Sequence, residues 1–159
     1  MRADLVLWRH ADAGDGAVTT DDPAADLARA LTGKGERQAG RMADWLNRQL
    51  PAGTRVLVSP ARRAQQTARA LDRRFKTLPA LGPGGSVDAL LQAVRWPDGR
   101  EPVLVVGHQP MLGMAAGYLL TGLATPLALR KAGIVWLRAR ERDAGLQVVL
   151  HAVLAPDLL

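Results

Sequence analysis

The sequence predicts an α/β fold: a three-layer α/β/α sandwich with a largely parallel central sheet and an antiparallel hairpin at the C-terminal edge. Short apolar runs end abruptly at polar residues and are followed by segments with a helical period, an alternation typical of parallel sheets. Near the C-terminus, apolar runs at 134–139 and 146–153 flank turn residues and indicate a hairpin.

The elements are expected in the following order. An apolar strand over 5–8 leads into 12–31, where Gly, Asp, Thr and Pro show little hydrophobic period and indicate a long loop that shapes the rim of a site. A helix over 32–50 follows, with Thr32 or Gly33 at its start. Residues 55–58 indicate a second strand, and the apolar spacing over 64–75 predicts a helix after it.

The second half repeats the pattern. Gly and Pro make 79–86 a loop, and 87–94 is expected to be a helix that ends before Trp96-Pro97. A strand over 103–106 leads into a helix that begins near Met111 and stops at Gly122.

Size and composition limit the number of domains, the kinds of site and the classes of partner that we expect. The 159 residues favour one domain over 1–159, and the absence of cysteine excludes disulfides, thiolate nucleophiles and cysteine metal sites. No secretory signal and no bilayer-spanning run are found, so we expect a cytoplasmic protein with no membrane partner. A net charge of +6 favours an acidic or phosphorylated partner. With 4% aromatic residues and no nucleic-acid motif, we expect no nucleic-acid partner.

Candidate catalytic residues follow the predicted strands. Arg9-His10 ends the first strand, Ser59 to Arg63 follow the second, and His108 ends a later one. Open α/β sheets bind ligands beyond the carboxyl ends of their strands, so these side chains should converge. A lone histidine at a strand end is usually structural, but two with an adjacent arginine favour an active site. Guanidinium groups and helix amino termini suit a phosphoryl group, which a neutral imidazole could attack.

Four segments, in order, resemble the histidine phosphatase superfamily and, within it, the small SixA-type phosphohistidine phosphatases. They are Leu7-Trp8-Arg9-His10-Ala11, the stretch from Leu31 to Ala39, the stretch from Ser59 to Ala68, and Val106-Gly107-His108-Gln109-Pro110. The resemblance implies that His10 is the phosphorylated nucleophile, that Arg9 and Arg63 bind phosphate, and that His108 faces the phosphoryl group.

Four further residues are weaker candidates for substrate binding. Ser59 could contact the phosphate or, as we favour, cap the following helix, and Gln109 has the same two interpretations. Arg62 competes with Arg63 for the phosphate, although a solvated position at the helix start fits it better. Asp88 is the nearest candidate for the acid that larger relatives use to protonate a leaving group, but a solvated first-turn residue is the more usual interpretation.

The resemblance therefore implies a metal-independent phosphatase without cofactors. No residue is obvious as the acid that would protonate the leaving group. We therefore expect a substrate whose leaving group does not depend on such an acid, namely a phosphohistidine-bearing protein. The alternatives are a phosphomonoesterase for a sugar phosphate or nucleotide, and a phosphate-binding or partner-binding module without turnover. Asp21, Asp22 and Asp26 are expected to be solvated rather than to bind a metal, and His151 to be a partly buried structural histidine.

Overall fold

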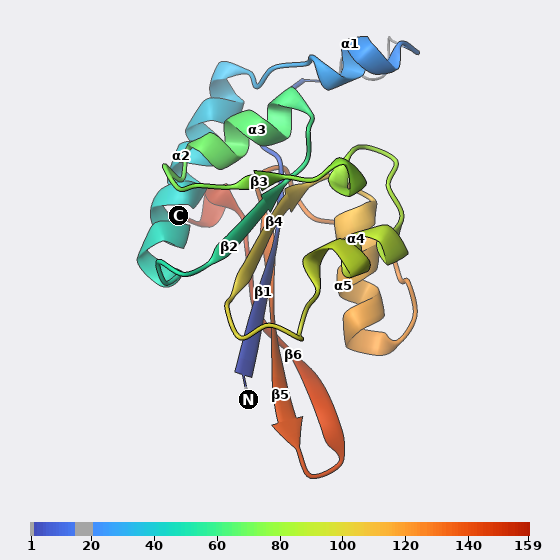
Figure 1. The fold of residues 1–159 in the computed structure, drawn as a ribbon. Coiled ribbons are helices and arrows are strands. Elements are labelled where there is room, and N and C mark those ends of the chain that lie inside the picture. Colours follow the sequence, from blue (N-terminus) through green and yellow to red (C-terminus); the bar gives the residue numbers. More distant parts are fainter. Residues whose placement is uncertain (1, 15–20) are drawn as a thin grey trace.

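A computed structural model describes residues 2–14 and 21–159. It contains a six-stranded sheet with the order β3-β2-β4-β1-β5-β6 (Figure 1). The strands are β1 (Arg2–Arg9), β2 (Arg55–Val58), β3 (Lys76–Thr77), β4 (Val103–Gly107), β5 (Ile134–Arg142) and β6 (Gly145–Leu154). β1 to β4 run parallel, whereas β5 is antiparallel to both β1 and β6. The predicted fold class and the C-terminal hairpin are confirmed.

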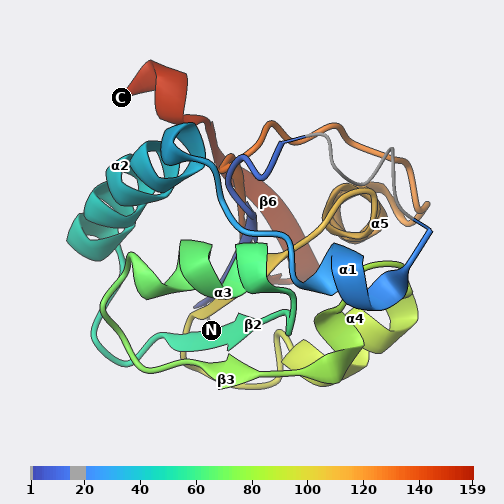
Figure 2. The same ribbon diagram turned by 90° about the horizontal axis from the view of Figure 1, so that it is seen from above.

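Helices cover both faces of this sheet (Figure 2). They are α1 (Pro23–Leu27), α2 (Gly33–Gln49), α3 (Arg62–Arg69), α4 (Val87–Val94) and α5 (Met111–Thr121), with 3₁₀ turns η2 (Pro79–Leu81) and η3 (Pro156–Leu158). Successive strand side chains point to opposite faces, so Val6 and Trp8 pack in the core under α2 and α3, while Leu5 and Leu7 pack in the core under α4 and α5. No helix of the described ranges is long and apolar enough to cross a membrane.

The predicted loop over 12–31 is wrong at 23–27, where α1 forms. The carboxylate of Asp22 accepts a hydrogen bond from the Ala24 amide at 3.0 Å, and Pro23 opens the helix, where its fixed φ angle suits the first turn. Residues 15–20 of the predicted loop lie outside the described residues.

Two further expectations need correction, and one strand was not expected. The helix predicted over 64–75 ends at Arg69, and the chain reverses at Asp72 with φ of 52°. The two exposed residues of β3 were not predicted, because they carry no apolar pattern and exist through pairing with β2. His151 is exposed rather than partly buried, since β6 is an edge strand; its ring contacts Trp136 at a centroid distance of 5.3 Å.

Candidate active site

His10 is fixed where the parallel strands end. Its amide donates to the carbonyl of Gly107 at 3.0 Å, so the pairing of β1 with β4 continues one residue beyond β1. Its carbonyl accepts from the Ala132 amide at 3.1 Å. The next amide, that of Ala11, donates to Thr67 Oγ1 at 3.0 Å. Three separate parts of the chain therefore hold the backbone on both sides of the ring.

The imidazole of His10 is neutral and has a defined tautomer. Nδ1 lies 2.8 Å from the carbonyl oxygen of Ala11, which can only accept, so Nδ1 carries the proton and Nε2 keeps its lone pair. Burial, together with the charges of Arg63, Arg9 and Arg29, lowers the pKa of His10 to about 4. At neutral pH, Nε2 is therefore available as a nucleophile.

His108 faces His10 across the end of the sheet. The two ring centroids are 5.1 Å apart, and the residues are only 9% and 4% exposed. Burial, followed by the charges of His10 and Arg63, lowers the pKa of His108 to about 3. Its Nε2 shares a hydrogen bond of 2.7 Å with Ser59 Oγ, and the same oxygen accepts from the Ala61 amide at 3.1 Å. Ser59 thus organises the turn before α3 and orients His108. The expectation that it caps the helix is wrong, because the N-cap position is occupied by Ala61 and has no side-chain cap bond.

Arg9, which is partly buried, and Arg63, which is buried, supply unpartnered donors beside the imidazoles. Arg9 Nη1 donates to the Leu129 carbonyl at 2.8 Å, and Arg63 Nη1 donates to the Asp26 carbonyl at 2.8 Å. Their Nε atoms are buried and have no hydrogen-bond partner. Buried donors without acceptors are rare in native proteins, and guanidinium groups match phosphoryl oxygens in geometry and charge. The arrangement is suited to bind an anion.

Two charged residues in and just after α1 belong to the site: Asp26, which was expected to be solvated but is partly buried and ion-paired, and Arg29, which the sequence did not assign to the site. Asp26 Oδ2 lies 3.3 Å from Arg63 Nη2, and Asp26 Oδ1 lies 3.1 Å from Arg29 Nε. Burial alone would raise the pKa of Asp26, but hydrogen bonds and charges from Arg29 and Arg63 lower it. The ionised carboxylate therefore covers one edge of Arg63. The three-residue spacing of Asp26 and Arg29 is the signal that could have revealed this pair.

The contacts made by Gln65, Gln66 and Thr67 account for the sequence pattern that follows Ser59. Gln65 Nε2 donates to the Ser59 carbonyl at 2.7 Å, and Gln66 Oε1 accepts from the Leu31 amide at 2.7 Å. Thr67 Oγ1 donates to the Arg63 carbonyl while accepting from Ala11. Three consecutive residues of α3 thus join it to the nucleophile loop, the start of α2 and the end of β2.

The remaining predicted residues lie at or beyond the edge of this cluster. Gln109 accepts from the Gly113 amide at 2.8 Å and donates to the Leu127 carbonyl at 2.9 Å, so it stabilises the start of α5 and the 123–129 segment. Arg62 is exposed in the first turn of α3. Asp88 is exposed in the first turn of α4 and lines a groove with Pro110 and Met111. The carboxylate whose charge acts on His108 is Asp26 rather than Asp88.

The described part of the chain contains no group of three or more His, Asp or Glu side chains that could hold a metal ion. The expected lack of a metal or cofactor stays a prediction.

Known proteins resemble the chain in sequence and fold. Residues 5–82 match the family model of the histidine phosphatase superfamily (branch 1). Phosphohistidine phosphatase SixA of Escherichia coli (strain K12) is 37% identical over 132 residues, which cover 77% of this chain and 78% of that protein.

Solved structures agree with this relationship. A structure of the protein histidine phosphatase SixA complexed with tungstate has a TM-score of 0.73 and 30% identity, and the match covers 98% of each chain. A putative SixA from Nakamurella multipartitia has a TM-score of 0.75 and 29% identity over 98% of this chain and 97% of that one. The chain belongs to the histidine phosphatase superfamily, in which its similarity is to the SixA branch, and it is a phosphatase.

Proposed function

We propose that the protein removes phosphate from phosphohistidine side chains of a partner protein through a phosphorylated His10 intermediate. The observation that carries the proposal is the His10 ring itself: a neutral imidazole with its lone pair on Nε2, surrounded by buried guanidinium donors. The tungstate bound by the SixA relative is a tetrahedral oxyanion, which supports a phosphate-sized ligand for the corresponding site here.

The first step transfers the phosphoryl group. The Nε2 lone pair of His10 forms a bond to phosphorus as the bond between phosphorus and the substrate imidazole breaks. The departing imidazole nitrogen takes a proton from solvent, or from His108 once the bound phosphoryl charge has raised the pKa of that ring and it has become imidazolium. The ring of His10 becomes positively charged, and its Nδ1–H bond to the Ala11 carbonyl, 2.8 Å long, stabilises that charge. Arg9 and Arg63 stabilise the charge on the phosphoryl oxygens.

The second step releases phosphate. A water molecule attacks phosphorus, the bond to Nε2 breaks, and the proton lost by water passes to solvent or to His108. Inorganic phosphate leaves and His10 returns to its neutral form. The dianionic phosphoryl group should raise the pKa of His108 while it is bound, since a nearby negative charge favours imidazolium.

The protonation state of the site supports phosphohistidine over a phosphoester. An alkoxide leaving group needs a proton donor, but the pKa of Asp26 is lowered and its carboxylate is ionised. Asp88 is exposed, and it is not among the charged groups that shift the pKa of either catalytic histidine. An imidazole is a much better leaving group than an alkoxide.

The cytoplasmic location expected from the sequence stays a prediction.

Steady-state kinetics on two substrate classes test this proposal. We expect a chemically phosphorylated histidine peptide to be hydrolysed with a far higher kcat/KM than phosphoserine, a sugar phosphate or a nucleotide. Fast turnover of a small ester with the phosphohistidine peptide untouched would favour the phosphomonoesterase alternative. Tight phosphate binding without turnover of any substrate would favour the module that lacks catalysis.

A further inference from the structure

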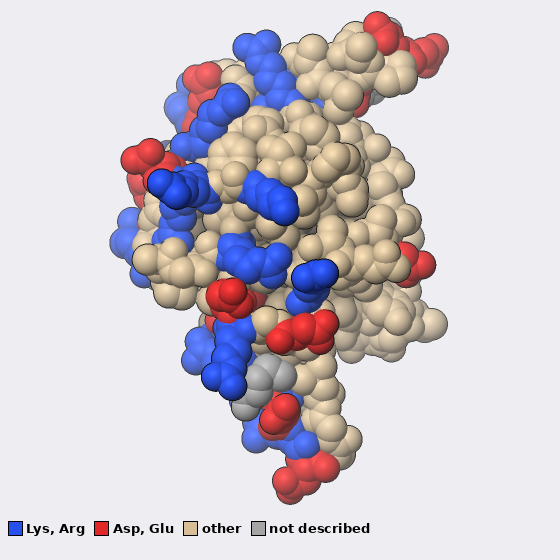
Figure 3. Space-filling view, viewed as in Figure 1, with Lys and Arg blue, Asp and Glu red and all other residues tan. Residues whose placement is uncertain are grey.

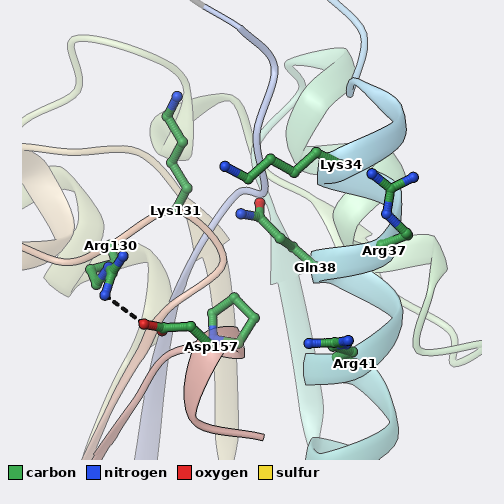
Figure 4. A pocket seen from close by; sticks show the side chains of 8 residues that line it. Lys34, Arg37, Gln38, Arg41, Arg130, Lys131 and Asp157 are labelled. Carbon is green, nitrogen blue, oxygen red and sulfur yellow. Dashed lines mark hydrogen bonds and ion pairs between the residues drawn. The ribbon is translucent and has the colours of Figure 1, made fainter.

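A basic groove lies between α2 and the C-terminal part of the chain (Figure 4). Its volume is about 460 Å³, and the charged residues that line it are Lys34, Arg37, Arg41, Arg130, Lys131 and Asp157. Five cations and one carboxylate thus line the groove. Lys34 extends from α2 toward the segment that carries Lys131, whereas Arg37 points away from that segment (Figure 4).

Most of this positive charge is not neutralised within the described chain. Lys34, Arg37 and Arg41 are exposed at successive turns of α2 and make no ion pair with a described residue. Arg130 pairs with Asp157 at 2.7 Å. On the face seen in Figure 3, basic residues gather over the side formed by α2 and α3, whereas the side with α4 and α5 shows few charges.

The groove is joined to the candidate active site through Asp12, which lies two residues after His10. Lys131 Nζ binds Asp12 Oδ1 at 2.7 Å, and Gln38 Oε1 accepts from the Asp12 amide at 3.0 Å. Both Lys131 and Gln38 line the groove. A ligand in the groove would therefore lie against the residues that support the nucleophile loop.

The dimensions and lining of the groove indicate its ligand. Lys34 and Arg41 are separated by about 10 Å along α2, at 1.5 Å per residue, so one small anion cannot contact both ends. No aromatic residue lines the groove, and single-stranded nucleic acids are usually bound by aromatic side chains on which their bases stack. An extended peptide with several carboxylates fits the charge and the length.

We propose that this groove binds an acidic segment of the phosphoprotein substrate while its phosphohistidine enters the site at His10. The proposal rests on the proposed function and specifies its partner as a protein with acidic residues near the phosphorylated histidine. Exposed charge pairs of this kind mainly accelerate association and select the partner, and their effect falls as salt rises.

Two peptides and two variants test the proposal. The peptides share one sequence around a phosphohistidine but carry either Glu or Gln in the flanking segment. The test variant is Lys34→Gln/Arg37→Gln/Arg41→Gln. The control, Arg48→Gln/Arg69→Gln/Arg74→Gln, removes three exposed charges elsewhere. Kinetics give kcat/KM, and fluorescence anisotropy gives the Kd of the unphosphorylated Glu peptide, a readout that does not depend on turnover.

For the wild type and the control variant, we expect kcat/KM in low salt to be roughly tenfold higher for the Glu peptide than for the Gln peptide. The ratio should fall toward one in the test variant, with turnover of the Gln peptide unchanged. Equal kcat/KM values of the wild type for the two peptides would overturn the proposed role of the groove while leaving the proposed function intact. Groove-dependent binding of the Glu peptide without turnover would support the groove and refute the proposed function. Tighter binding of a single-stranded oligonucleotide of equal charge would overturn the acidic-protein partner.

Discussion

Acid should destabilise this protein in a pH range set by its two active-site histidines. Both rings are neutral when folded, with pKa values lowered from 6.5 to about 4 for His10 and about 3 for His108. Between these values and 6.5 the unfolded chain binds more protons than the folded one, so stability falls as pH is lowered. The contribution of these two histidines to the free energy of unfolding is fully present above pH 6.5 and is lost progressively below it.

The magnitude follows from the proton affinities. At about 1.4 kcal/mol per tenfold change, moving from pH 7 to pH 4 removes roughly 3 kcal/mol for each ring, and about 6 kcal/mol for both as an upper value. That is comparable to the whole stability of many domains, about 5–15 kcal/mol. Carboxylates contribute only at lower pH: hydrogen bonds from Lys131 and Thr32 lower the pKa of Asp12 to about 2, so its contribution is lost below its ordinary value of 3.8.

Urea unfolding followed by tryptophan fluorescence at pH 7, 6, 5 and 4 measures this loss. The variant His10→Asn removes one titrating ring and should roughly halve the loss between pH 7 and 4. His151→Gln is the control: burial and the charge of Arg138 lower the pKa of that histidine too, but its side chain is exposed and screened by solvent, so its removal should change the pH dependence much less than His10→Asn does. A wild-type free energy of unfolding that is flat from pH 6.5 to 4, or an unaltered slope in His10→Asn, would refute the assignment of two buried neutral imidazoles.

Three substitutions give further tests. In Gly35→Ala the new Cβ would lie 2.1 Å from a backbone carbonyl oxygen of the nucleophile loop. We expect the free energy of unfolding, measured by chemical denaturation, to fall by roughly 2–4 kcal/mol and the activity to be weaker. The control Gly40→Ala has open space on the same helix and should raise the free energy of unfolding by up to about 1 kcal/mol. Asp26→Asn should tighten phosphate binding, measured by calorimetry, by roughly fivefold. The substitution removes a carboxylate that competes with phosphate for Arg63, while the backbone carbonyl of residue 26 still holds that arginine. Unchanged or weaker phosphate binding would contradict this role of Asp26. Asp88→Asn should leave kcat on the phosphohistidine peptide within about twofold, and a large loss would identify this carboxyl as an acid.

Much of the fold and of the site follows from local patterns. Strand ends can be located from apolar runs that stop at Arg9-His10 and before His108, and the parallel sheet brings those ends together. Thr32 was predicted near the start of a helix, and its hydroxyl accepts from the Gly35 amide as an N-cap does. These features depend on neighbouring residues and on one general rule of sheet topology.

The features that were missed depend on tertiary contacts. α1 has five residues and no buried side chain, so it shows no apolar period, and only the cap Asp22 and Pro23 mark its start locally. Its contact from Asp26 to Arg63 joins residues that are distant in sequence. The basic groove likewise combines α2 with Arg130 and Lys131 from far along the chain. No local period could indicate either arrangement.

The central claim is that His10 carries the phosphoryl group during turnover. Rapid quenching with a labelled phosphohistidine peptide, followed by peptide mapping, tests it most directly. We expect one phosphate on His10, labile in acid and stable in base, that appears within a single turnover and is absent from His10→Ala. Phosphate found on His108 instead, or full turnover by His10→Ala, would contradict the mechanism.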